Sequence, residues 1–536
     1  MKLLVATASL VLLAAGNLAL GQQTLPRIVQ KDGRYALFVD GAPYLILGAQ
    51  VNNSSAWPAV LPKVWPAIEA LHANTIEMPV YWEQMEPQEK HFDFSIVDTL
   101  LLQAREHHLH LVLLWFGTWK NGSGHYTPEW MKRRPDLYPH MLDARGQTVD
   151  SLSPYAPATL EADTLAFSAL LRHLKDTDLE HTVLMVQVEN EPGTWGLVRD
   201  YSPRAEKLFQ SNVPQSLLSA MHWQGTPNTG SWPQVFGADA EEFFHAWSVA
   251  SFIGHVAAAG KAIYPLPLYT NAALRDPLHP GHPPSYESGG PTDNVLAIWK
   301  AAAPALDLLA PDIYMSDGPR YEKVLDLYSR PDNPLLVPET GNSPAFAPFF
   351  FAALGHGAIG FSPFGIDQTG YSNAPLGASR IDEETLAPFA ANYKLIEPMD
   401  REIARLNFEG KLQAVTEEKG RPSQTLSFGK WHADIAYGLL QFGYNKNPPG
   451  NPEPVGRALV AQLSDNQFLV TGFFCRVDFT VADTTSGKKR QFLRVEEGNF
   501  QDAKFVPTRI WNGDQTDYAL NFTSMPQVLR VKLDTY

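Results

Sequence analysis

The chain has 536 residues, of which 44% are hydrophobic and 18% are charged, a composition typical of folded proteins with one to four domains. Its formal net charge is −15 at pH 7 and no basic patch stands out, which argues against nucleic acid and anionic membrane surfaces as partners. The only cysteine, Cys475, excludes an intrachain disulfide and a zinc site built from cysteines. Aromatic residues make up 11%, with 13 tryptophans, which suits either stacking against sugar rings or a large core.

The first residues have the features of an export signal. Met1 and Lys2 give a short positive start, residues 3–15 are largely apolar, and small residues at 19–21 offer a cleavage site before Gln22. We therefore expect residues 1–21 to be a signal peptide that is removed, and the mature protein to be periplasmic or secreted. No later stretch is apolar for 18 residues, so we expect a soluble protein without a membrane-spanning helix.

Strand-like and helix-like stretches alternate between residues 22 and 406. A hairpin is predicted first, over residues 36–43, with Asp40-Gly41 as its turn. We then expect eight buried strands at residues 44–50, 74–82, 109–116, 183–188, 266–271, 308–314, 335–339 and 358–361. The helices between them are expected at residues 62–71, 95–107, 159–176, 239–262, 294–303, 321–328, 345–354 and 383–406. Eight such units predict an α/β fold of the (β/α)8 TIM-barrel type. A doubly wound sheet is the alternative, but no glycine-rich phosphate loop follows any of these strands.

The composition changes near Phe408. Stretches rich in valine and threonine follow, such as residues 456–474, in which apolar and polar positions alternate, and Gly, Asn and Asp turns are frequent. We therefore predict a second domain over residues 407–536, an all-β sandwich without metal-ligand spacing.

Two predicted barrel strands end in acidic residues. The apolar run in residues 182–196, TVLMVQVENEPGTWG, stops at Glu189, Asn190 and Glu191, and a Pro-Gly pair then starts a loop. The seventh predicted strand, within LLVPETG at residues 335–341, ends in Glu339. Carboxylates at the ends of core strands are costly to bury, and two of them from parallel strands are what acid-assisted glycoside cleavage requires. The alternative is that both acids are structural, held by arginine or by backbone amides.

The polar residues that end the fourth predicted strand have different expected roles. Alternation along a strand places Gln187, Glu189 and Glu191 on one face, so parity alone does not choose between the two acids. Glu191 stands at the very end, beside the turn, where a substrate can reach it. Glu189 is then expected to be a buried supporting group.

Two long loops follow predicted strands three and five, where a barrel builds its site. At or just past the end of the third predicted strand, before and within the loop of residues 117–152, four residues are candidates for binding the sugar: Trp115, Trp119, Lys120 and Asn121. Packing in the core is an equally good interpretation of these residues. The loop of residues 272–292 contains His279 and His282 without the spacing of an HExxH zinc site, so we expect no metal there.

Three segments resemble known β-galactosidases. Residues 187–193, QVENEPG, resemble glycoside hydrolase family 35, in which Q-x-E-N-E is typical of strand four. Residues 81–94 fit families 35 and 42 alike, and residues 355–366 resemble strand eight of the bacterial branch of family 35, which carries a C-terminal β-domain. Animal-type members differ, since they have a tyrosine near Pro79 and a Cys-Ala-Glu segment in place of residues 116–121, so their sugar contacts are not carried over.

The resemblance implies roles for four residues. Glu191 would be the general acid/base and Glu339 the nucleophile, Asn190 would bind the 2-hydroxyl of the sugar, and Tyr314 would contact the nucleophile. For Asn190 the alternative is a turn residue, and for Tyr314 it is an ordinary core aromatic.

The activity implied is that of a retaining exo-β-galactosidase with a carbohydrate substrate and no cofactor. Bacterial relatives are associated with removing galactose from xyloglucan side chains. The alternatives are a related glycosidase acting on arabinose or glucose, and a secreted carbohydrate-binding protein on an inactive barrel. The sequence leaves the oligomeric state open, a homodimer included.

Overall fold

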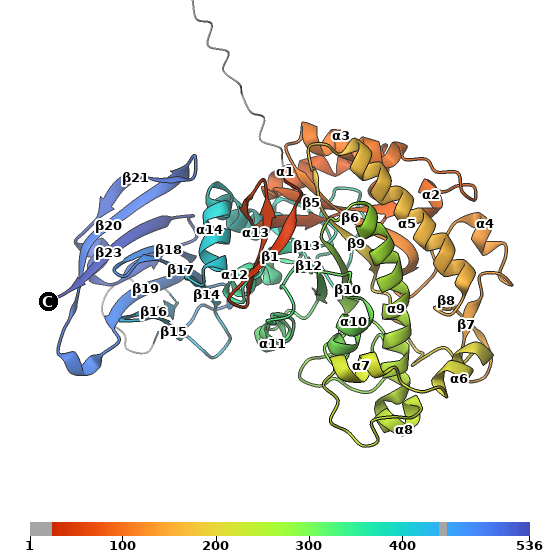
Figure 1. Cartoon of the computed structure of the whole chain (residues 1–536). Helices are drawn as coiled ribbons and strands as arrows, with labels where there is room; N and C mark the ends of the chain where they lie inside the picture. The colour runs from red at the N-terminus through yellow and green to blue at the C-terminus, as the bar shows by residue number, and fades with distance from the viewer. Residues whose placement is uncertain (1–23, 439–447) are drawn as a thin grey trace, which may run out of the picture.

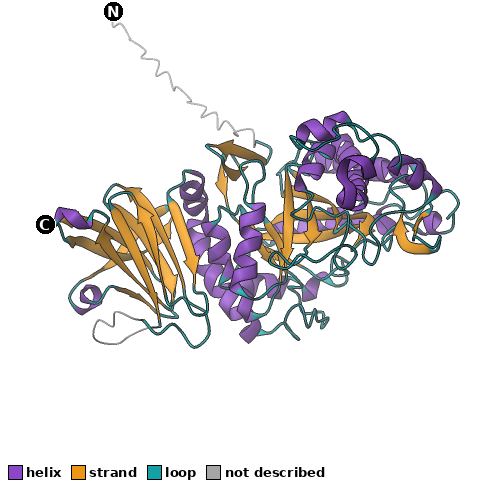
Figure 2. Ribbon diagram, turned by 90° about the horizontal axis from the view of Figure 1, so that it is seen from below, coloured by secondary structure: helices purple, strands orange, loops and turns teal. Residues whose placement is uncertain are grey.

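The structure, a computed structural model, describes residues 24–438 and 448–536 (Figure 1). A barrel surrounded by helices lies beside a body made almost entirely of strands, which contains the C-terminus (Figure 2). The expected signal peptide, residues 1–21, lies outside the described residues. Within the two described ranges, no helix combines the length and the hydropathy that crossing a membrane would need.

A small antiparallel sheet precedes the barrel. It consists of β1 (Arg27–Lys31), β2 (Arg34–Val39) and β3 (Ala42–Tyr44), paired in sequence order. The predicted hairpin joins β2 to β3 through Asp40 and Gly41, whose φ angles are 53° and 78°. A two-residue hairpin turn needs such left-handed angles, which the Asp-Gly pair adopts readily.

Eight parallel strands close into a barrel in the order in which they occur along the chain. They are β4 (Ile46–Gln50), β5 (Thr75–Tyr81), β6 (His110–Lys120), β9 (Val183–Asn190), β10 (Leu268–Ala273), β11 (Leu308–Ile313), β12 (Val337–Thr340) and β13 (Gly360–Pro363). Nearly all of their residues are buried, as expected for strands covered on both faces. The predicted TIM-barrel fold is confirmed, and each predicted strand overlaps one of these eight.

Helices surround the barrel and fill the connections between its strands (Figure 1). They are α1 (Trp65–Leu71), α2 (Trp82–Met85), α3 (Ser95–Glu106), α4 (Glu129–Lys132), α5 (Pro157–Thr177), α6 (Pro203–Phe209), α7 (Gln215–Ala220), α8 (Trp232–Phe236), α9 (Ala240–Ile263), α10 (Leu296–Ala302), α11 (Gly318–Tyr328), α12 (Phe349–Gly355), α13 (Glu383–Ile396) and α14 (Asp400–Phe408). The single long helix expected over residues 383–406 is wrong, because a 3-10 turn at Glu397–Met399 separates α13 from α14. Pro398 lies in that turn, and a proline offers no N–H for a continuous helix.

The third barrel strand is longer than the sequence indicates. β6 continues past Phe116 to Lys120, and its pairing with β9 shifts register between Trp115 and Lys120. The short hairpin of β7 (His140–Leu142) and β8 (Thr148–Leu152) follows within the predicted loop. The start of the predicted site loop is therefore part of the barrel wall.

The C-terminal domain is a sandwich of two antiparallel sheets, as predicted. One sheet has the order β14-β17-β18-β23-β20-β21 and the other has the order β15-β16-β19-β22. The strands are β14 (Leu412–Thr416), β15 (Ser423–Phe428), β16 (Trp431–Tyr437), β17 (Arg457–Ser464), β18 (Gln467–Phe473), β19 (Cys475–Val481), β20 (Arg490–Gln501), β21 (Lys504–Trp511), β22 (Leu520–Phe522) and β23 (Val528–Thr535), with α15 (Asp514–Asp517) between β21 and β22. Inward-facing side chains of both sheets, Trp431, Phe468 and Val477 among them, form its core.

Candidate active site

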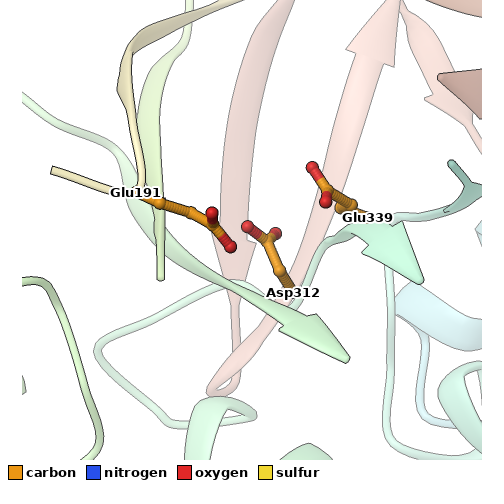
Figure 3. Close-up of side chains that lie close together, drawn as sticks. All are labelled: Glu191, Asp312 and Glu339. Carbon is orange, nitrogen blue, oxygen red and sulfur yellow. The ribbon is translucent and has the colours of Figure 1, made fainter. Parts of the chain in front are cut away.

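Three carboxyl groups meet where the barrel strands end. Glu191 directly follows β9, Asp312 lies near the end of β11, and Glu339 is on β12. One oxygen from each of these carboxyl groups lies within 4.8 Å of the other two. In Figure 3 the carboxyl group of Asp312 stands between those of Glu191 and Glu339. The structure thus brings together the two acids singled out in the sequence and adds a third.

Glu191 is held at the end of its strand in a strained conformation. Its φ is 42°, which is unusual for a residue with a side chain, and its backbone N–H donates to Oδ1 of Asn271 at 2.9 Å. Burial, followed by the charge of Glu339, raises the pKa of Glu191 to about 7, although Lys120 and Asp312 oppose the shift. A carboxyl group with such a pKa can give up and take back a proton near neutral pH.

Glu339 is buried and its carboxylate is oriented from both sides. Tyr314 donates its hydroxyl hydrogen to Oε1 at 2.5 Å, and Gln50, the last residue of β4, donates to Oε2 at 3.0 Å. Two donors on one carboxylate fix its direction. Glu339 is therefore held in a defined orientation at the end of its strand.

Asn190 has an unsatisfied side chain beside this site. It is fully buried, and neither its amide nitrogen nor its carbonyl oxygen has a hydrogen-bond partner in the structure. Buried polar groups are normally paired, so a free amide adjacent to Glu191 in the chain indicates a place for a ligand hydroxyl. Its backbone carbonyl oxygen accepts a hydrogen bond from the N–H of Asn121 at 3.0 Å, which ties the end of β9 to the turn after β6.

Glu189 faces away from Glu191 and supports the barrel wall. Its carboxylate accepts hydrogen bonds from the backbone N–H groups of Thr118 and Trp119, at 3.1 Å and 2.7 Å. Asp163 lies against it from α5, and burial raises the pKa of both carboxyl groups. The structure therefore places Glu189 in a supporting role, bound to the backbone of β6.

The four candidates for sugar binding in and just after β6 separate into two pairs. Trp115 and Trp119 are fully buried, and their ring N–H groups donate to Asp163 and to the carbonyl oxygen of Leu152. Both therefore pack in the core, the alternative that the sequence left open. Lys120 lies near Glu191, and its ammonium group donates to the side chain of the exposed Asn121.

Sequence reasoning missed several polar residues of the site: Gln50, Asn271, Glu287 and Asp312. Three of them lie at or near the end of a barrel strand, and polar residues at the ends of otherwise apolar strands are the signal that could have found them. Glu287 comes from the loop after β10, is fully buried, and neither of its carboxyl oxygens has a hydrogen-bond partner in the structure. Burial, and then the charge of Glu191, raise the pKa of Glu287 well above its usual range.

Each of the three central carboxyl groups offers one oxygen to this cluster, and hydrogen-bond donors already contact Glu339 and Asp312. Among the described residues, neither His279 nor His282 belongs to a group of three or more side chains arranged to hold a metal ion. Both histidines are exposed in the loop after β10.

The sequence of this region matches a known family. Residues 61–235 match the model of glycoside hydrolase family 42, described as β-galactosidase, a segment that contains Glu191. This segment is therefore similar to the β-galactosidases of that family. The match is to family 42, so the resemblance to family 35 in particular stays a prediction. Residues 389–523 match a domain of unknown function (DUF5597), and no curated protein matches the chain.

Solved structures with a similar arrangement include two bacterial β-galactosidases. The enzyme from Bacillus circulans sp. alkalophilus is 16% identical, with a TM-score of 0.48 over 67% of this chain and 57% of that one. The enzyme from Rahnella sp. R3 is 18% identical, with a TM-score of 0.48 over 68% of this chain and 58% of that one. The catalytic domain of a β-amylase from Paenibacillus polymyxa is 14% identical, with a TM-score of 0.44 over 59% of this chain and 91% of that one. The chain thus covers less than two thirds of the length of the two β-galactosidases.

Proposed function

We propose that this protein is a retaining exo-β-galactosidase in which Glu191 is the general acid/base and Glu339 the nucleophile. The observation that carries the proposal is the approach of the two carboxyl groups, with oxygens within 4.8 Å, where the barrel strands end. Retaining glycosidases hold their catalytic carboxyl groups about 5–5.5 Å apart, whereas inverting enzymes separate them by about 6.5–9.5 Å to admit a water molecule. The separation supports direct attack by a carboxylate.

In the first step Glu339 attacks the anomeric carbon while Glu191 protonates the departing oxygen. The bond to the leaving group breaks as the ester bond to Glu339 forms, and the leaving group departs as an alcohol. The hydrogen bonds from Tyr314 and Gln50 keep the carboxylate of Glu339 aimed during the attack. The free amide of Asn190 is placed to bind the 2-hydroxyl, a contact that strengthens as positive charge develops on the sugar.

In the second step Glu191, now ionised, removes a proton from water. The resulting hydroxide attacks the anomeric carbon and displaces Glu339, which leaves as a carboxylate, and Glu191 is protonated again. The pKa of about 7 suits a group that must serve as an acid and then as a base.

Galactose is favoured as the sugar because residues 61–235 match a family described as β-galactosidase. The resemblance to the bacterial branch of family 35 extends the proposal to galactose on plant polysaccharides such as xyloglucan. Residues 1–21 extend it to an exported enzyme, periplasmic or secreted.

A panel of nitrophenyl glycosides tests both the sugar and the chemistry. We expect kcat/KM for the β-galactoside to exceed that for the β-glucoside and the α-L-arabinoside by about tenfold or more, as one misplaced hydroxyl costs a hydrogen bond. The Glu339→Gln variant should be inactive on every member while keeping the unfolding temperature of the wild type within a few degrees. If kcat/KM were higher for the arabinoside than for the galactoside, arabinose would replace galactose as the proposed sugar. If the wild type hydrolysed no member of the panel, a carbohydrate-binding protein would be favoured.

A further inference from the structure

The proposed mechanism gives no role to Asp312, although this residue lies between the two acids that react (Figure 3). Asp312 is only 3% exposed. Its Oδ2 accepts a hydrogen bond from Nδ2 of Asn271 at 2.6 Å, whereas its buried Oδ1 has no partner that satisfies hydrogen-bond geometry. A buried carboxylate oxygen without a donor is costly, and a proton on that oxygen would remove the cost.

Electrostatics also favours a proton on Asp312. Burial raises the pKa of Asp312 well above its usual range, the charges of Glu339 and Glu191 raise it further, and Lys120 opposes them. Three carboxyl groups within 4.8 Å of one another cannot all be ionised at little cost, because each like charge at such a distance disfavours the next. Glu339 must be ionised to attack, so the protons belong on Glu191 and Asp312.

Asn271 determines which oxygen of Asp312 carries the proton. Its Oδ1 accepts the backbone N–H of Glu191, so its Nδ2 must be the group that faces Asp312 as a donor. Oδ2 of Asp312 is then an acceptor, which leaves Oδ1 as the hydroxyl oxygen of the acid.

We propose that Asp312 is a positioning residue that keeps a proton on Oδ1 throughout the reaction and donates it in a hydrogen bond to Glu191. This inference rests on the proposed function and deepens it. When Glu191 has protonated the leaving oxygen, its new carboxylate accepts the hydrogen bond from Asp312. When Glu191 then takes a proton from water, Asp312 retains its own, so Asp312 neither gains nor loses a proton over the cycle.

The titratable groups that interact with Asp312 come from several elements. They are Glu191 after β9, Glu339 on β12, Lys120 at the end of β6, Tyr269 on β10, Tyr314 after β11 and Tyr328 at the end of α11. Burial raises the pKa of each of the three tyrosines well above its usual range, so they stay neutral where the enzyme works. Changes in the pH dependence of activity caused by substituting Asp312 therefore report on Glu191.

The pH profile of kcat/KM tests the proposal. Its fall at high pH, the basic limb, follows loss of the proton from Glu191, so the direction in which a substitution moves this limb is informative. An asparagine at position 312 mimics the protonated acid, with its oxygen facing Asn271 and its NH2 facing Glu191. We expect Asp312→Asn to leave the limb within about half a pH unit of the wild type. Asp312→Ala removes the donor and should move the limb to higher pH. If Asp312 were ionised instead, removing its charge would lower the limb by about one pH unit or more in both variants, and that result would overturn the proposal.

Infrared spectroscopy detects the proton on Asp312 directly, without substrate turnover. The difference spectrum of wild type minus Asp312→Asn at pH 7 should contain the C=O band of a protonated carboxyl group. If that difference shows only the bands of an ionised carboxylate, Asp312 does not hold the proton and the proposal fails. Absence of glycosidase activity in a wild type that shows the protonated band would reject the proposed function alone.

Discussion

At the scale of single residues, environment assigns different tasks to four acids of similar chemistry. Glu191 is partly buried beside other carboxyl groups, which raises its pKa to about 7, whereas Glu339 receives two hydrogen-bond donors. Glu189 is two residues from Glu191 along the chain, yet it is bound to backbone amides of β6. Asp312 lies between the reacting pair. The sequence pattern alone cannot make these distinctions, because in the sequence all four residues are simply acids at or near the ends of predicted strands.

The pH dependence of activity follows from the state of Glu191. Its pKa is raised to about 7, so its acid form is complete well below pH 7 and is lost as the pH rises through that value. For a galactoside with a poor leaving group, kcat/KM should therefore fall above about pH 7. The profile should be measured from pH 4 to 10 in buffers of constant ionic strength. A basic limb that begins above about pH 9 would contradict the assignment of Glu191 as the acid.

Rescue by azide distinguishes the roles proposed for Glu191 and Glu339. The Glu191→Ala variant should still form the galactosyl ester from an aryl galactoside with a good leaving group and then stall, because water lacks its base. Azide needs no base, so it should restore turnover and give the β-galactosyl azide. Glu339→Ala cannot form the ester, and azide should attack from the opposite face to give the α-product. NMR of the products distinguishes the anomers, and an α-product from Glu191→Ala would reverse the assignment.

At the scale of elements, the site depends on the contact between the loops after β9 and β10. Thr194 pairs with Ser288 through two backbone hydrogen bonds, and Gly193 lies against Glu287 and Gly290. A Cβ added to Gly193 would lie 2.5 Å from Cγ of Glu287 and 2.7 Å from the backbone nitrogen of Gly290. The Pro-Gly pair therefore does more than end a strand, since the glycine permits this close approach.

Gly193→Ala should accordingly reduce kcat/KM by about tenfold to a hundredfold, because it displaces a loop that begins two residues after Glu191. Gly124→Ala is a matched control in the neighbouring loop, where the added carbon would lie at least 3.4 Å from other atoms. Kinetics of both variants on one aryl galactoside check the expectation. Equal activity of the two variants would show that the close approach at Gly193 does not position Glu191.

The extension of β6 shows why some site expectations could not come from sequence. Trp115 and Trp119 look like candidates for stacking on a sugar, because they lie near a strand end at the start of a long loop. In the fold, the ring N–H of Trp115 donates to Asp163 of α5, and that of Trp119 donates to the carbonyl oxygen of Leu152. A contact between residues 48 positions apart cannot be read from the strand itself.

At the scale of the whole molecule, a buried arginine joins the two domains. Arg457 on β17 donates to Oδ1 of Asn392 on α13 at 2.8 Å, and its guanidinium lies 4.2 Å from the ring centroid of Phe473. Burial lowers the pKa of Arg457 to about 9. The two domains should therefore resist separation.

Arg457→Met should reduce the free energy of unfolding by about 1–3 kcal/mol, because Asn392 would keep a buried acceptor without a donor. The activity of folded molecules should be unchanged, since the site lies in the barrel. Arg421→Ala, which removes an exposed pair with Glu418, is the control and should change the free energy by about 0.5 kcal/mol or less. Chemical denaturation provides both values, and equal effects would show that the junction adds nothing to stability.

The overall architecture was largely accessible from the sequence because it depends on local patterns. Eight apolar runs alternating with helices predict a barrel, and the change to period-two alternation after Phe408 predicts the sandwich. The split between α13 and α14 was missed, although Pro398 signals it. The proximity of Asp312 and Gln50 to Glu339 was not predicted, because it depends on strand register and on closure of the barrel.

The central claim, that Glu339 carries the sugar as an ester, can be tested directly by trapping that ester. A 2-deoxy-2-fluoro galactoside with a good leaving group slows both steps, so the covalent enzyme should accumulate and be visible by mass spectrometry. After proteolysis, we predict the added mass on the peptide that contains Glu339. The added mass on a peptide containing Glu191 or Asp312, or inactivation without any added mass, would contradict the account.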